Sequence, residues 1–173
     1  MAEADRIMLF TERAKAASAE VLGPAPKSGL AEEIGRALSA GRHPRAVAHP
    51  SLLTIHPWLE FASSDCDLVR HADLGIIAAR YGIARTGTCV YEPSNSAERL
   101  IALLPPTCLI LLRTADIVAD IGALAAAFDD RHAGVAQSLF ITGPSRTGDI
   151  EHVLTLGMQG PGRLVIALWH EDT

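Results

Sequence analysis

The amino-acid sequence predicts an α/β fold, a mixed sheet flanked by helices, and three observations support this prediction. The chain of 173 residues is 49% hydrophobic but only 5% aromatic, which suits an aliphatic core between helices and a sheet. Residues 108–112 are apolar without interruption, as in a strand covered on both faces. Stretches with helical spacing of apolar residues alternate with such strands. A chain of this length most simply forms one domain.

The N-terminal region is predicted to be a helix followed by a linker. Apolar residues recur at intervals of three and four over residues 6–21, which places them on one face of a helix. Residues 23–29 have the sequence Gly-Pro-Ala-Pro-Lys-Ser-Gly, which is typical of a linker. We therefore expect residues 1–29 to form an arm that packs either on the domain over residues 30–173 or on a partner subunit.

The next segment is predicted to contain a second helix and a short strand. Apolar residues form a helical stripe over residues 30–38, and residues 45–50 have the pattern of a strand closed by proline. The residues that follow have no clear pattern. This region also holds His43, His49 and His56, whose irregular spacing favours structural or exposed histidines over metal ligands.

Two helices are predicted in the central part of the chain. One covers residues 97–104, and Asn95 and Glu98 have the spacing of a capping box at its start. The other is expected to begin after Thr114, which would cap it, and to extend to Phe128 along an apolar stripe.

Strand patterns surround these helices. Residues 74–79 and 83–91 are expected to be two strands with a turn at residues 81–82. A buried strand is expected at residues 138–142, which with the strand at 108–112 and the helix between them would form a right-handed βαβ unit.

The C-terminal part of the chain is predicted to end in a closing pair of strands. The first covers residues 152–156 and the second residues 164–169, with a turn at 157–161 between them.

The loop at residues 143–148 is the most specific feature of the sequence. It follows a predicted buried strand and combines two glycines with hydroxyl side chains and one arginine. One interpretation is a ligand site, because open α/β sheets bind ligands beyond the ends of their strands. The other is a tight turn in which Ser145 caps a helix and Arg146 pairs with Asp149 or Glu151.

Composition argues against several classes of function. The net charge of −5 and the scattered basic residues disfavour nucleic-acid binding. The acidic start shows no signal peptide and the longest apolar stretch is too short to span a bilayer, so we expect a cytoplasmic protein without membrane contact. Cys66, Cys89 and Cys108 are too few and too widely spaced for a disulfide framework, a zinc site or an iron–sulfur cluster. We expect this chain to bind no metal.

Four motifs mark the second half of the chain. They are Ala-Arg-Thr-Gly-Thr-Cys-Val at residues 84–90, Arg-Leu to Leu-Pro at 99–105, Ile-Thr-Gly-Pro-Ser-Arg-Thr-Gly-Asp-Ile-Glu at 141–151 and Gly-Met-Gln-Gly-Pro at 157–161. Their order resembles that of the LUD (lactate utilisation) domain family, and the resemblance extends over residues 65–170. The third motif is long enough to be specific, whereas Thr-Gly-Thr alone would be weak.

The resemblance implies a fold similar to the NagB/RpiA/CoA-transferase group. It also implies an accessory subunit in the oxidation of L-lactate to pyruvate, with iron–sulfur proteins as partners. The iron–sulfur clusters would then lie in the partner subunits, and this chain would bind no cofactor. The resemblance assigns no chemical step to the subunit, and we predict no catalytic residue.

The expected pocket lies between two of these motifs, where the Thr-Gly-Thr motif would face residues 145–147 and bind a small anionic metabolite. Guanidinium groups suit a carboxylate or a phosphate, so arginines are prominent among the candidates. The predicted ligand-binding residues are Arg85, Thr86, Gly87, Thr88, Arg99, Gly143, Ser145, Arg146, Thr147, Asp149 and Glu151.

The sequence departs from the family pattern at two positions. Arg85 stands where the family usually has an acidic residue, and Gln159 stands where it usually has histidine. Each exchange removes a group that could transfer a proton or bind a ligand. Arg85 would also make the pocket wall basic and so favour an anion.

Two other hypotheses follow from the same residues. The protein could be a stand-alone enzyme or sensor for a carboxylate or a phosphorylated metabolite, or a divergent family member without an active site of its own. A nucleophilic role for Ser145 has little support, because no Gly-x-Ser-x-Gly elbow is present. The sequence leaves open whether the chain forms a homo-oligomer.

Overall fold

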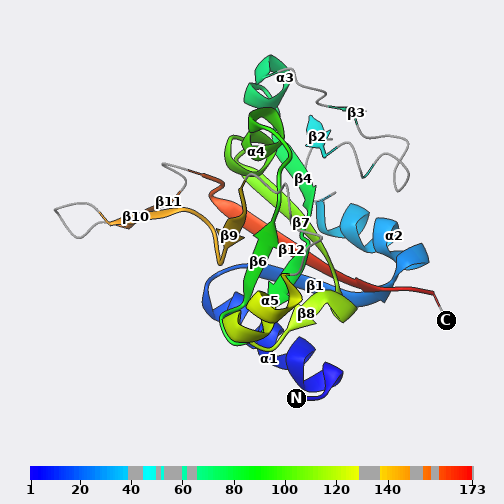
Figure 1. Ribbon diagram of the computed structural model, residues 1–173. Helices are drawn as coiled ribbons and strands as arrows, with labels where there is room; N and C mark the ends of the chain where they lie inside the picture. Colours follow the sequence, from blue (N-terminus) through cyan, green and yellow to red (C-terminus); the bar gives the residue numbers. More distant parts are fainter. Residues whose placement is uncertain are drawn as a thin grey trace.

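Among the described residues, six strands form the main sheet, in the order β1-β12-β7-β4-β2-β3 (Figure 1). The computed structural model describes residues 1–38, 45–49, 52, 60–61, 66–128, 137–148, 154–156 and 160–172. Every neighbouring pair of strands in this sheet runs parallel. The six strands are β1 (Glu20–Pro26), β2 (Ala46–Ala48), β3 (Glu60–Phe61), β4 (Leu74–Ala78), β7 (Thr107–Arg113) and β12 (Arg163–His170).

Strands β7 and β12 lie inside the sheet because both of their faces are apolar. Ile110 and Ile166 belong to the core on one face, and Leu109 and Val165 to the core on the other. None of these four side chains is more than 1% exposed. This arrangement confirms the buried strand predicted at residues 108–112.

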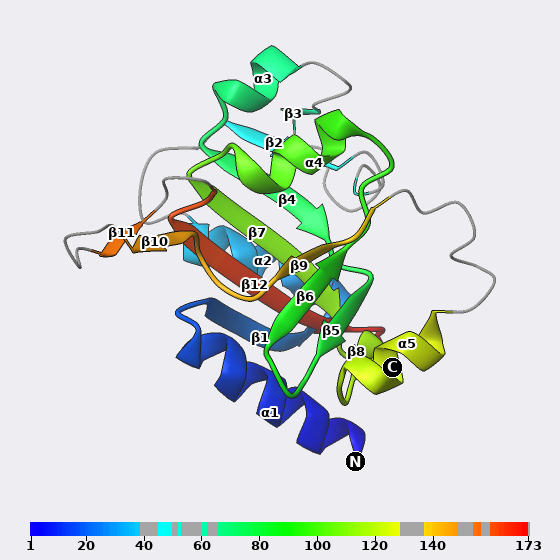
Figure 2. The ribbon, with the colours of Figure 1, turned by 60° about the vertical axis from the view of Figure 1, so that its left-hand side comes forward.

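Helices cover both faces of the main sheet (Figure 2). On one face lies α2 (Lys27–Leu38), which contributes Leu30 and Ile34 to the core and confirms the predicted second helix. On the other face lie α1 (Glu3–Ala16), α3 (Cys66–Arg70) and α4 (Ser96–Leu103). The side chain of Asn95 accepts a hydrogen bond from the backbone N–H of Glu98, so the predicted cap of α4 is confirmed.

A second sheet, with four strands in the part of the chain that the structure describes, has the order β8-β5-β6-β9 and packs on the same face as α4 (Figure 2). A separate antiparallel ribbon of β10 and β11 projects from the body of the molecule (Figure 1). The remaining elements are β5 (Tyr81–Ile83), β6 (Thr88–Tyr91), the 3-10 helix η2 (Thr114–Asp116), β8 (Ile117–Val118), α5 (Ile121–Ala127), β9 (Leu139–Ile141), β10 (Arg146–Gly148) and β11 (Leu154–Leu156). The observed fold is the predicted class, a mixed α/β fold flanked by helices.

The predicted linker is a strand. Helix α1 ends at Ala16, earlier than expected, and β1 then forms an edge of the main sheet beside β12. Pro24 and Pro26 lack a backbone N–H, which an edge strand tolerates because one side of it has no strand to bind. The register between β1 and β12 shifts between Leu22 and Ala25, around the first of these prolines.

The hairpin turn in the Thr-Gly-Thr region lies later than predicted. Tyr81 and Gly82 belong to β5, and the turn that joins β5 to β6 covers residues 84–87. The carbonyl oxygen of Ile83 accepts hydrogen bonds from the backbone N–H groups of Thr86 and Gly87, which closes this turn.

The predicted βαβ unit is wrong. β9 pairs antiparallel with β6 at the edge of the second sheet and takes no part in the main sheet. Phe140, which was expected to be buried, is 52% exposed. A run of three apolar residues does not reveal which of two sheets it joins, and this is where the prediction failed.

Two further predictions in the second half of the chain differ from the structure. Thr114 begins η2, and it is the side chain of Asp120 that caps α5 by accepting a hydrogen bond from the N–H of Ala123. The predicted closing strands do not pair with each other, because β12 lies between β1 and β7 while β11 pairs with β10.

Candidate functional site

Three threonine hydroxyl groups form a chain of hydrogen bonds between the β5–β6 turn and the end of β9. The Oγ1 atoms of Thr86 and Thr88 lie 2.7 Å apart, and those of Thr88 and Thr142 lie 2.9 Å apart. Thr88 is buried at 5% exposure, whereas Thr86 and Thr142 are exposed. Two motifs that are distant in the sequence therefore meet through one buried hydroxyl group.

The glycines of the same two motifs contact the C-terminal end of α1. Gly87 has a φ of +67°, and a Cβ atom placed on it would lie 2.3 Å from the backbone nitrogen of Ala14. A Cβ atom on Gly143 would lie 2.4 Å from the carbonyl oxygen of Ala17. Both positions require glycine because the backbone of α1 comes too close for any side chain.

Ser145 lies beside the last of the four motifs. Its backbone N–H donates a hydrogen bond to the carbonyl oxygen of Pro161 at 2.8 Å. Gly160 lies against the Ser145 side chain, since a Cβ atom there would be 3.3 Å from that of Ser145. The loop after β9 thus joins the Thr-Gly-Thr turn on one side and the Gly-Pro step before β12 on the other.

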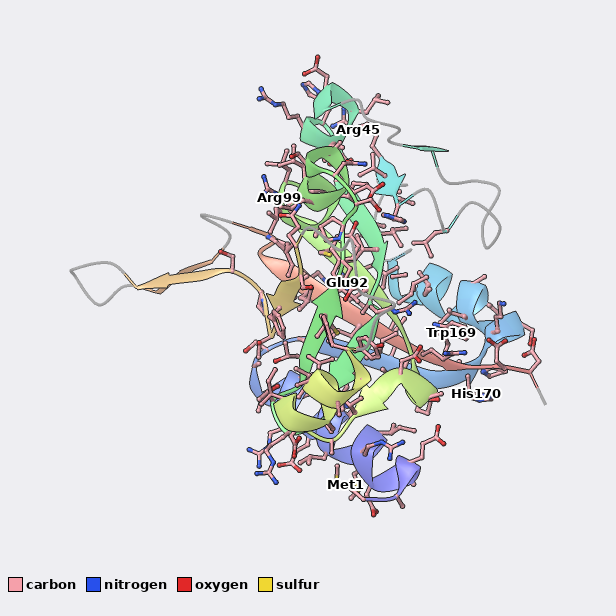
Figure 3. The ribbon with its side chains drawn as sticks, viewed as in Figure 1. Met1, Arg45, Glu92, Arg99, Trp169 and His170 are labelled. Carbon is pink, nitrogen blue, oxygen red and sulfur yellow. The ribbon has the colours of Figure 1, made fainter. Side chains whose placement is uncertain are left out.

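Two of the three predicted arginines, Arg85 and Arg99, have described side chains, and they lie on different elements. Arg85 is exposed on the hairpin turn, where its backbone N–H donates to the carbonyl oxygen of Ala119. Arg99 lies on α4, toward the end of the molecule opposite α1 (Figure 3), and its Nη1 donates to Oε1 of Gln137 at 3.1 Å. Gln137 precedes β9, whereas Thr142 follows it.

Four predicted site residues lie wholly or partly outside the described structure. Arg146 and Thr147 have described backbones in β10, where they pair with Leu156 and Thr155, but their side chains are not described. Asp149 and Glu151 lie outside the described residues, as does Gln159. Their proposed contacts with a ligand therefore stay predictions.

A second polar cluster, which the sequence did not reveal, lies at the other end of β6. Nε2 of His49 is 3.1 Å from Oε2 of Glu98, and the two side chains are 17% and 13% exposed. The ring of Tyr91 stands perpendicular to the imidazole with the centroids 6.0 Å apart, and its hydroxyl donates to the carbonyl oxygen of Glu98. The only signals in the sequence were a histidine directly after a strand and a glutamate in a capping box.

The carboxylate of Glu98 is held firmly. It accepts a hydrogen bond from the backbone N–H of Ser94 at 2.6 Å and another from Nδ2 of Asn95 at 3.0 Å. Burial alone would raise the pKa of Glu98, but the hydrogen bonds from Ser94 and His49 outweigh burial and lower it. Glu98 is therefore ionised at neutral pH and presents a fixed negative charge to His49.

The cysteine side chains that the structure describes are unsuited to bind a metal. Cys89 and Cys108 are buried, and burial raises the pKa of both thiols, that of Cys108 to about 12. Both thiols thus stay protonated at neutral pH. Among the described residues, no three side chains of His, Cys, Asp or Glu lie close enough together to hold a metal ion.

The fold places the chain in a known structural class. A crystal structure of a DUF162 family protein from Deinococcus radiodurans matches it with a TM-score of 0.68 over 98% of this chain and 99% of that one. The two sequences are 20% identical, so this likeness shows the fold alone. Within the described part of the chain, no helix has the length and apolar character needed to cross a membrane.

The sequence identifies the family within that class. The profile of the LUD domain matches residues 66–168, and the chain belongs to the LUD domain family. Lactate utilization protein C from Geobacillus kaustophilus is 31% identical over 113 residues, which cover 62% of this chain and 47% of that protein. The Escherichia coli protein YkgG is 32% identical over 98 residues, which cover 54% of this chain and 42% of that protein. The chain thus aligns with about half the length of these relatives.

Proposed function

We propose that this LUD-domain protein acts in lactate utilisation, as an accessory subunit like lactate utilization protein C (LutC) in the oxidation of L-lactate to pyruvate. The observation that carries the proposal is the similarity to proteins of that name, together with the match of the LUD domain over residues 66–168. Thr86, Thr88, Thr142, Ser145 and Gly160 all lie inside the matched residues 66–168. We further propose a cytoplasmic location.

Iron–sulfur proteins are the partners that this proposal requires. Oxidation of lactate to pyruvate removes two electrons, and the chain has only three cysteines for a cluster that usually needs four. Two of the three are buried in the core as protonated thiols. The residues present therefore do not fit a cluster, and a partner subunit would have to carry the electrons.

Gene deletion tests the lactate role. The organism that encodes the chain is grown with L-lactate or with pyruvate as the only carbon source, before and after deletion of the gene. We expect growth on L-lactate to be lost and growth on pyruvate to be kept, with restoration by the intact gene. Unchanged growth on L-lactate would overturn the proposal, and loss of growth on both acids would place the function elsewhere in metabolism.

Purification tests the partner proposal separately. The tagged chain is isolated at low salt from cells grown on L-lactate, and the iron and acid-labile sulfide that accompany it are measured. We expect both to copurify in amounts comparable to the chain. The chain could instead purify alone and free of iron, from cells in which the chain is required for growth on L-lactate. In that case the stand-alone enzyme or sensor becomes the better description.

A further inference from the structure

β9 is an edge strand of the second sheet, and in the described part of the chain it pairs with β6 alone (Figure 2). Edge strands of soluble proteins are usually protected by prolines or charged side chains, because their unpaired backbone groups attract further strands. β1, an edge of the main sheet, is protected in this way by Pro24 and Pro26. Residues 137–142, which contain β9, include neither a proline nor a charged residue. The edge at β9 is therefore open to pairing with another strand.

The backbone of Phe140 points toward this open edge. In β6, the carbonyl oxygen of Val90 accepts a hydrogen bond from the N–H of Arg80, beside β5. Successive residues of a strand direct their backbone groups to opposite sides, so Cys89 and Tyr91 direct theirs toward β9. Their partners in β9 are the two neighbours of Phe140, Ile141 and Leu139. Phe140 thus directs its N–H and carbonyl oxygen away from β6, where the described structure shows no partner for them.

The side chains at this edge form an apolar centre between two hydroxyl groups. Phe140 lies opposite Val90, on the face of the second sheet that α5 covers in part, and it is 52% exposed. Side chains alternate along a strand, so Ser138 and Thr142 lie on the same face as Phe140. The hydrogen bond between Thr142 and Thr88, two residues before Val90, agrees with this placement. The edge thus presents serine, phenylalanine and threonine in that order.

We propose that β9 pairs with the β9 strand of a second copy of this chain, in antiparallel direction about a two-fold axis at Phe140. The N–H and carbonyl oxygen of Phe140 would then bond to the carbonyl oxygen and N–H of its counterpart. The two phenylalanine rings would lie side by side at the axis, and Ser138 of each copy would face Thr142 of the other. Aromatic pairs and pairs of hydroxyl groups both stabilise neighbouring strands, and a hydroxyl group can donate as well as accept.

A second copy fits this edge better than an unrelated strand because the edge is complementary to itself. A two-fold interface brings the same surface of both copies together, so each feature must match its own image. Phe140 lies at the middle of the series and meets itself, while the hydroxyl groups lie two residues away on either side. The pairing would also place Ser138 of one copy beside the threonine chain of the other, through Thr142. The proposal rests on this edge and not on the role in lactate utilisation.

Sedimentation equilibrium of the full chain tests the pairing. The chain has a mass of 18.3 kDa, and we expect the wild type to sediment with twice this mass. Phe140→Glu should raise the dissociation constant of the dimer about tenfold or more, because two carboxylates would face each other at the axis. Phe140 is more than half exposed, so the variant should fold, which circular dichroism checks.

Ile121→Glu is the matched control for this variant. Ile121 is 61% exposed and begins α5, which packs on β5 and β8 at the other side of the second sheet. The same exchange of an exposed apolar side chain for a carboxylate should therefore leave the dissociation constant of the dimer unchanged.

A disulfide tests the register of the two strands. Hydrogen-bonded antiparallel pairs have Cα atoms about 5.5 Å apart, within the range that a disulfide spans. Cys66→Ser leaves the buried Cys89 and Cys108 as the native thiols. In this background, oxidation with copper phenanthroline should link Phe140→Cys into a covalent dimer on a non-reducing gel, whereas Ile121→Cys should stay a single chain.

Three outcomes would overturn the proposal. They are a wild type that stays monomeric at the highest soluble concentration, an unchanged dissociation constant in folded Phe140→Glu, and oxidation that links Ile121→Cys as readily as Phe140→Cys. A monomeric wild type would leave the β9 edge to a strand of another protein. Because the disulfide measurement does not use Phe140→Glu, it decides the question even if that variant fails to fold.

Discussion

Thr88 is the residue that joins the two family motifs in space. Its hydroxyl group lies between those of Thr86 and Thr142, and Thr142 is 54 positions away in the sequence. A buried hydroxyl group without a partner would cost about 1–3 kcal/mol, so the two neighbours stabilise its burial. Thr86 and Thr142, at the two ends of this series of hydroxyl groups, are both exposed.

Gly87 is a residue at which substitution should be poorly tolerated. Gly87→Ala places a Cβ atom 2.3 Å from the Ala14 nitrogen at a φ of +67°, and the left-handed conformation alone costs about 1–2 kcal/mol. We expect a loss of more than about 2 kcal/mol in the free energy of unfolding, measured by urea denaturation. Gly35→Ala in α2 is the matched control, because nothing lies within 4 Å of the new Cβ atom. For this variant we expect the free energy of unfolding to rise by about 0.5–1 kcal/mol. Equal effects at the two positions would contradict the observed packing of α1.

The residues of the site were only partly predictable. Thr86, Thr88, Gly143 and Ser145 were named because they belong to recognisable motifs, and the structure brings these motifs together. Thr142 belongs to the same motif as Ser145, but it was left out of the predicted site because it was assigned to the buried strand over residues 138–142. His49 escaped for a different reason, since its partner Glu98 follows it by many residues and neither position carries a local signal of the pairing.

At the scale of single elements, α4 shows how local and long-range interactions combine. Its capping box was readable from the sequence because Asn95 and Glu98 are three positions apart, and such pairs satisfy each other locally. The same glutamate also binds His49, which attaches the start of the helix to the end of β2. The helix cap therefore belongs to the second polar cluster as well.

This dual role predicts an acid-sensitive contribution to stability. The pKa of folded Glu98 lies below its ordinary value of 4.5, so its contribution is complete above that pH and is lost as the pH falls through the lowered folded value. The free energy of unfolding of the wild type should therefore fall in acid more steeply than that of Glu98→Gln. Urea denaturation at neutral pH and at about pH 3 measures the free energy of unfolding of both proteins. If the difference between the two free energies were the same at both pH values, the prediction would be contradicted.

Element type was easier to predict than element pairing. α2, α4, β4 and β7 follow from periodicity and capping, which are properties of neighbouring residues. β9 was assigned to the wrong sheet, and Ile117 was assigned to a helix although it forms β8. In both cases a short apolar segment satisfied the pattern of one element while the rest of the fold placed it in another.

At the scale of the whole molecule, the N-terminal segment is integral to the sheet. β1 pairs along β12, and Phe10 and Ala14 of α1 are fully buried in the same core as Ile110. If residues 1–29 were an arm on a linker, the core would be covered by the rest of the chain alone. In the structure, β1 instead forms an edge of the main sheet and α1 covers part of one of its faces.

Removal of this segment should destabilise the entire fold. A chain that begins at Lys27 lacks α1 and β1, so it exposes the edge of β12 and one side of the core. We expect it to aggregate or to bind the dye ANS strongly, with loss of near-ultraviolet circular dichroism. A chain that begins at Glu3 is the control and should behave as the full chain. Cooperative unfolding of the shortened chain at an unchanged midpoint would instead support a separable arm.

The pairing of β1 with β12 also orders events during synthesis. Glu20 lies opposite Val165, so β1 has no neighbour in the sheet until the residues around position 165 have left the ribosome. At about 5–20 residues per second, this interval is on the order of ten seconds. Throughout it, the side of β1 that pairs with β12 has no partner strand. A chaperone that binds the nascent β1 segment would therefore have its greatest effect before β12 appears.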